Sequence, residues 1–234
     1  MATLILYVIM LLASTWGMLI FLGIRFYRSM YTDEGYLSHT LPVTANQLFL
    51  SKILVSGVWY LFISIGIGIS VVALVVSLMT GLLNIGELSS VLTQYNGNIW
   101  EFLADAFYEL GRTYEEEMGI NLLHYGITLL LTYVAGPFIT MVTLFGALTI
   151  GQLSSKHKGF MGILTYAGVT ILSSIIGSTV QSAFMFGTNV MSSSGGFSVT
   201  TNMAYDINVI TSLLIAAIMY GVSYYIMNRK LNLD

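Results

Sequence analysis

Residues 53–79 read ILVSGVWYLFISIGIGISVVALVVSLM, and none of these 27 residues is Asp, Glu, Lys, Arg or His. A helix needs about 20 mostly apolar residues to cross the hydrocarbon core of a bilayer, so this stretch is long enough for one crossing. Strands of a membrane barrel show alternating segments of about ten residues, whereas the apolar run here is continuous. The stretch therefore predicts a membrane-spanning helix.

The composition of the whole chain agrees with a membrane location. Only 8% of its 234 residues are charged and 56% are hydrophobic, whereas a soluble domain has about 25% charged residues. These values exclude a disordered chain, and the absence of cysteine excludes a disulfide scaffold. A formal net charge of −3 without a basic stripe argues against a nucleic-acid partner. We expect an integral membrane protein in contact with a lipid bilayer.

Further stretches without Asp, Glu, Lys or Arg are also long enough for a crossing. They cover residues 1–24, 118–155, 159–205 and 207–228. We predict an all-α, polytopic transmembrane helical bundle that forms one domain over residues 1–234. Its five spans are expected at about residues 4–23, 53–79, 125–151, 160–184 and 207–227.

The cations set the orientation. If every predicted span crosses the membrane, seven of the eight Lys and Arg residues lie on one side: Arg25, Arg28, Lys52, Lys156, Lys158, Arg229 and Lys230. Only Arg112 lies on the other side. The positive-inside rule makes that side cytoplasmic. The C-terminus is then cytoplasmic and the N-terminus lies outside.

The predicted cytoplasmic loop 25–52 is aromatic and apolar as well as charged. Gly35 permits a break between two short helical pieces, while Pro42 and Thr44 suit the start of a second helix. One interpretation is an interfacial connector with an aromatic belt. The other is a surface that packs on a partner protein.

The predicted outer segment 84–123 contains an amphipathic pattern. One helical face carries Ile99, Leu103, Ala106, Phe107, Leu110 and Tyr114, and another carries Glu101, Asp105 and Glu109. Arg112 is spaced to pair with Glu109. We expect a helix on the outer membrane surface with a solvated acidic face; an extracellular gate or a vestibule for cations is the alternative.

Chemistry is sparse inside the predicted spans. None has Asp, Glu, Lys or Arg at its centre, and the three His residues lack metal-ligand spacing. The sequence has no phosphate-binding loop and no hydrolase motif. We therefore expect neither an enzyme nor a metal site nor a cofactor held by this chain, and any energy for transport must come from another subunit.

A possible pathway or hinge involves two of the spans. Gly136 and Pro137 lie in the third span, where the missing amide donor of the proline predicts a kink. The fourth span is weakly polar, and its residues can line a path or bind helices together: Ser173, Ser174, Ser178 and Gln181. Close helix packing is indicated by the small-residue pairs Gly66/Ser70, Ala147/Gly151, Ser173/Gly177 and Ser178/Ser182.

Four short motifs lie within residues 25–52. They are Asp33-Glu34-Gly35-Tyr36-Leu37, Thr40-Leu41-Pro42-Val43, Gln47-Leu48 and Ser51-Lys52. This run resembles the cytoplasmic loop of the permease subunits of bacterial type-two ABC exporters. The resemblance implies a coupling helix that docks on a nucleotide-binding subunit and contains Asp33, Glu34, Gly35, Tyr36, Leu37, Leu41 and Pro42, with Lys52 at the start of the next span.

The resemblance also implies partners and a location. A second permease subunit, identical or paralogous, would complete the path, and an ABC ATPase subunit would hold ATP and magnesium. The location would be the cytoplasmic (inner) membrane of a bacterium. The family has six spans, so the resemblance implies that the first of them is missing here. The alternative function is a non-transporting scaffold, sensor or immunity subunit of a membrane complex.

Overall fold

The computed structural model describes residues 2–32, 44–83, 98–118, 122–154, 157–191 and 196–229. Within these ranges the chain is helical apart from short connections, and no strand is present. The helices are α1 (Ala2–Tyr31), α3 (Ala45–Leu83), α5 (Ile99–Met118), α6 (Leu122–Gly151), α7 (Lys158–Met191) and α8 (Gly196–Arg229). The prediction of an all-α bundle is confirmed.

Within the described residues, five helices are long and apolar enough to cross a membrane. The stretches are Thr3–Tyr31, Asn46–Leu78, Leu123–Gly151, Lys158–Ala183 and Asp206–Asn228. This supports a multi-pass membrane protein.

The first two helices extend further than the spans expected from the sequence. α1 continues to Tyr31, past the expected end of the first span near Gly23, whereas the start of α3 at Ala45 agrees with the second helix expected in the loop, which continues into the next span. Residues 25–31 and 45–52 of the expected loop 25–52 are therefore helical. The cations marked where the apolar stretch ends, but Arg and Lys are good helix formers and do not end a helix. Their long side chains also let the charge reach water from a helix that continues.

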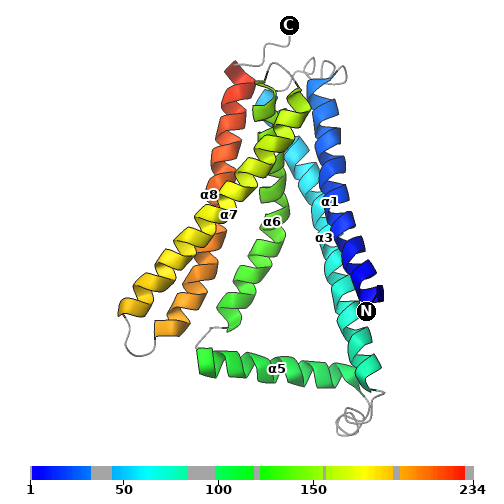
Figure 1. The fold of residues 1–234 in the computed structure, drawn as a ribbon, viewed down its shortest axis with the longest axis vertical. Helices are drawn as coiled ribbons and strands as arrows, with labels where there is room; N and C mark the ends of the chain where they lie inside the picture. Colours follow the sequence, from blue (N-terminus) through cyan, green and yellow to red (C-terminus); the bar gives the residue numbers. More distant parts are fainter. Residues whose placement is uncertain are drawn as a thin grey trace.

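The helices meet at one end of the molecule and diverge toward the other. The C-terminal ends of α1, α6 and α8 lie beside the N-terminal ends of α3 and α7, and we call this the convergent end (Figure 1). Toward the opposite end, the α7–α8 pair separates from the α1–α3 pair, and α5 lies across that far end (Figure 1). The convergent end also holds the hydrophobic core.

Aromatic rings from three helices fill this core. The rings of Phe26 in α1 and Phe145 in α6 are stacked, with centroids 3.9 Å apart and planes 5° apart. Phe49 of α3 meets Phe26 edge-on at 5.9 Å. Met30 and Met141 are also buried beside them. Offset and edge-to-face ring contacts add to the free energy gained from burial, so they fix α1, α3 and α6 together.

Glycines allow α6 to approach both α7 and α8. A Cβ atom on Gly151 would lie 2.4 Å from the backbone nitrogen of Gly162, and one on Gly146 would lie 3.0 Å from Oγ of Ser223. The predicted small pair Ala147/Gly151 therefore lies at a real helix contact. The backbones of α6 and α7 touch at this point because neither glycine carries a side chain.

Candidate functional site

A hydrogen bond fixes the end of α1 at the convergent end. The hydroxyl of Tyr31, the last residue of α1, lies 2.8 Å from Oγ1 of Thr149 in α6. Thr149 is fully buried and donates its own hydrogen to the carbonyl oxygen of Phe145 at 2.8 Å. A hydroxyl has one hydrogen, so Tyr31 is the donor in the bond between the two helices. The chain therefore leaves α1 from a point anchored on α6.

The start of α3 is fixed in two ways. Thr44 and Gln47 form a reciprocal capping box: the Gln47 amide donates to Oγ1 of Thr44 at 3.3 Å, and the Thr44 amide donates to Oε1 of Gln47 at 3.1 Å. The expectation that Thr44 caps this helix is confirmed. In addition, the hydroxyl of Tyr220 in α8 donates to Oδ1 of Asn46. The chain therefore enters α3 at a point anchored on α8.

These anchors lie on either side of most of the predicted coupling residues. Asp33, Glu34, Gly35, Tyr36, Leu37, Leu41 and Pro42 fall outside the described residues. Lys52 is described and lies in α3, about 10 Å along the helix from its start at 1.5 Å per residue. Sequence reasoning missed both anchors, because each joins residues that are more than a hundred positions apart.

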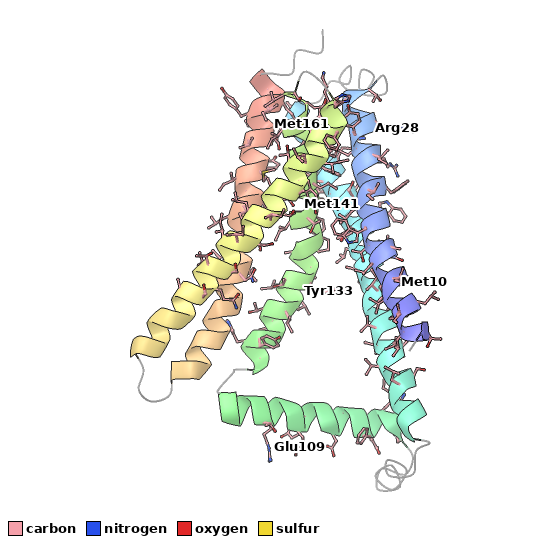
Figure 2. The ribbon with its side chains drawn as sticks, viewed as in Figure 1. Met10, Arg28, Glu109, Tyr133, Met141 and Met161 are labelled. Atoms are coloured by element: carbon pink, nitrogen blue, oxygen red, sulfur yellow. The ribbon has the colours of Figure 1, made fainter. Side chains whose placement is uncertain are left out.

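Charge is separated between the two ends of the molecule. Arg28 lies at the convergent end, whereas Glu109 lies on α5 at the far end (Figure 2). Glu101 and Asp105 share α5 with Glu109. The predicted pair is present, with Nη2 of Arg112 3.6 Å from Oε2 of Glu109.

A polar contact joins the start of α6 to Asp206, which lies ten residues into α8. Nε2 of His124 lies 3.1 Å from Oδ2 of Asp206, and Thr128 donates to Oδ1 of Asp206 at 3.4 Å. The only sequence signal for this contact was that His124 directly precedes the predicted span 125–151 and Asp206 directly precedes the predicted span 207–227. α6 thus has polar contacts with neighbouring helices near both of its ends, through His124 and Thr149.

The predicted hinge lies in α6. The helix continues through Pro137, which is buried, and the carbonyl of Gly136 accepts a bond from Thr140 Oγ1 at 2.8 Å. A side-chain hydroxyl thus bonds the carbonyl of the residue directly before the proline. The kink and its role as a hinge stay predictions.

The predicted pathway serines lie in α7. Ser173 and Ser174 donate to the carbonyl of Thr170, and Ser178 donates to the carbonyl of Ile175. Their hydroxyls therefore bond their own helix instead of a neighbouring one. Ser174 and Ser178 are exposed, whereas Ser173 and Gln181 are partly buried.

A partly open pocket lies in a different part of the bundle. A cavity of about 270 Å³ lies between α1, α3 and α6, and its lining is mostly apolar with a few hydroxyl groups. The lining residues are Thr15, Tyr60, Ile63, Ser64, Ile67, Gly68 and Tyr133. The sequence did not indicate this cavity, because its walls come from three separate helices.

Among the described residues, no group of three or more His, Cys, Asp or Glu side chains could hold a metal ion. Comparison of the chain with protein-family models, curated proteins and solved structures finds no match in any of the three.

Proposed function

We propose that this chain is the transmembrane permease subunit of an ATP-driven ABC exporter. A separate ATPase subunit binds ATP and magnesium and supplies the energy. The segment 25–52 receives the movement of that subunit, and the bundle changes its opening in response. The C-terminus is cytoplasmic, and the membrane is the inner membrane of a bacterium.

The observation that carries the proposal is the pair of anchors beside residues 33–43. A force on this segment acts on α1 and α3 directly, and it also reaches α6 through Tyr31 and α8 through Asn46. Four of the five candidate membrane helices are thus linked to one short segment. A coupling element needs such links, because a movement confined to a surface loop would not reach the bundle.

The substrate path is proposed to lie between two permease subunits, identical or paralogous. The cavity between α1, α3 and α6 is mostly apolar and carries the hydroxyls of Thr15, Tyr60, Ser64 and Tyr133. Such a lining favours an apolar or amphipathic substrate, for example a lipid, a peptide or a drug.

The test is co-purification with the soluble ATPase encoded beside this chain. The wild-type chain should retain the ATPase on an affinity column and stimulate its ATP hydrolysis. The double variant Glu34→Arg plus Leu41→Asp should lose both, because it reverses one charge and introduces another in the predicted coupling segment.

The matched control is Glu101→Arg plus Tyr108→Asp, which makes the same change of charge on the exposed face of α5. It should bind and stimulate the ATPase like the wild type. If Glu34→Arg plus Leu41→Asp also behaves like the wild type, the coupling assignment is wrong. If the wild-type chain retains no ATPase, the scaffold, sensor or immunity function replaces the exporter.

A further inference from the structure

A groove between α1 and α3 carries two cations on its walls. It has a volume of about 180 Å³ and is lined by Leu22, Arg25, Phe26, Ser29, Ser51, Lys52, Val55, Ser56 and Trp59. Among the residues that the structure describes, neither Arg25 nor Lys52 has an ion-pair partner, and no carboxylate lines the groove. Two cations on neighbouring membrane helices attract the anionic headgroups of membrane lipids.

The lining changes from polar to apolar with depth. α1 and α3 run in opposite directions here, so Arg25, Ser29, Ser51 and Lys52 lie nearer the convergent end, while Leu22 and Trp59 lie further from it (Figure 1). Lys52 and Trp59 are seven residues apart, or about 10 Å along α3 at 1.5 Å per residue. The groove therefore has cations and hydroxyls near the convergent end and apolar surface further from it.

The groove also opens toward the outside of the bundle. Its floor is formed by Leu22 and Phe26, which are 3% and 2% exposed, whereas the side chains of Val55 and Trp59 are each 56% exposed. Both helices belong to candidate membrane spans, so the apolar part faces lipid. Trp is enriched at the depth where headgroups meet acyl chains.

We propose that this groove binds the headgroup phosphate of an anionic phospholipid. Arg25 and Lys52 pair with the phosphate, while the hydroxyls of Ser29 and Ser51 keep their hydrogen bonds to the carbonyls of Phe26 and Leu48. The acyl chains continue along Val55 and Trp59.

A membrane lipid fits this groove better than free phosphate. Inorganic phosphate would use the cations but leave the apolar lower part without a function, whereas a phospholipid matches both parts. Basic pockets between membrane helices are known sites for anionic headgroups. The inference goes beyond the exporter proposal and does not depend on it, since it concerns only the lipid contact of α1 and α3.

Trp59 is a built-in reporter for the test. The chain has three Trp residues, so Trp16→Phe plus Trp100→Phe leaves Trp59 as the only one. This background is reconstituted into phosphatidylcholine vesicles that contain a few per cent of brominated lipid, either phosphatidylglycerol or phosphatidylcholine. Brominated phosphatidylglycerol should quench Trp59 at a lower mole fraction than brominated phosphatidylcholine.

Adding Arg25→Gln plus Lys52→Gln should abolish this preference. Each cation removed should raise the mole fraction of brominated phosphatidylglycerol needed for the same quenching roughly fivefold. Arg28→Gln plus Lys158→Gln is the matched control, because it removes the same charge from the convergent end but not from the groove. The swap Arg25→Lys plus Lys52→Arg keeps both charges and should keep the preference, which distinguishes loss of charge from damage to the fold.

Three results would overturn the proposal. The first is equal quenching of Trp59 by the two brominated lipids in the single-tryptophan background that keeps Arg25 and Lys52. The second is an equal loss of preference in the control pair or in the swap, since general surface attraction or packing would then explain the effect. The third is displacement of brominated phosphatidylglycerol by millimolar inorganic phosphate, which would assign the groove to a soluble anion.

Discussion

The hydroxyl groups of Tyr31 and Thr149 lie 2.8 Å apart and join the last residue of α1 to a fully buried position in α6. The donor is Tyr31, since the hydrogen of Thr149 is bonded to the carbonyl of Phe145. Removal of Thr149 therefore leaves the Tyr31 donor without its acceptor, whereas removal of the Tyr31 hydroxyl leaves Thr149 with the bond that it donates.

Tyr31→Phe should lower the free energy of unfolding by about 1 kcal/mol, because Thr149 loses one accepted bond but keeps the bond that it donates. Thr149→Val should cost more, about 1–3 kcal/mol, because the Tyr31 donor then has no acceptor. Denaturant titration in detergent micelles of both single variants and the double variant completes a double-mutant cycle, which measures the interaction energy between Tyr31 and Thr149. Tyr224→Phe, at an exposed position of α8, is the control. Independent, additive effects would contradict the assigned bond.

Gly151→Ala should be the most damaging glycine substitution in α6. The added Cβ would lie 2.4 Å from the backbone nitrogen of Gly162, so the two helices must move apart. Overpacking of this kind costs about 1–3 kcal/mol. Gly168→Ala in α7 meets no atom within 4 Å and should be neutral or stabilise the helix by about 0.5–1 kcal/mol. Thermal unfolding in micelles compares the two variants, and equal midpoints would argue against the close contact.

Phe145→Ala should destabilise the core by about 3–5 kcal/mol, because the ring is fully buried and stacked on Phe26. The matched control is Phe62→Ala, which removes the same ring from a side chain that is 64% exposed. The control should change the free energy of unfolding by about 0.5 kcal/mol or less. A similar loss in both variants would mean that the core does not lie at the convergent end.

The chain has no cysteine, so single cysteines can report which side of the membrane a residue faces. Leu153→Cys in the α6–α7 connection should react with a membrane-impermeant maleimide only after the cells are permeabilised. Tyr108→Cys on the exposed face of α5 should react in intact cells. Labelling of both cysteines from the same side would contradict the five-span topology.

The sequence predicted the membrane helices well, because apolar length and the positions of charges are local properties. It did not predict where the helices end: α1 continues past Gly23, since nothing between Arg25 and Tyr31 breaks a helix. A charge marks the edge of the apolar stretch, and the helix can continue into the interface.

The contacts between helices were harder to predict. The small-residue spacing of Ala147/Gly151 and of Ser178/Ser182 is the same, yet Gly151 touches α7 while both serines are exposed. Which small face meets a partner depends on the crossing of the helices, and sequence spacing does not contain that information. For the same reason the partners of Tyr31 and Asn46 could be found only in the structure.

The glycine contact between α6 and α7 lies close to one end of α7, so it divides the helix into a short and a long arm. Gly162 lies about 6 Å from the start of the helix at Lys158 and about 44 Å from its last residue, Met191, at 1.5 Å per residue. A rotation of about 5° around this point moves the near end by about half an ångström and the far end by about 4 Å. The short arm lies at the packed end, so a rotation of α7 about this contact would displace its far end much more than its near end.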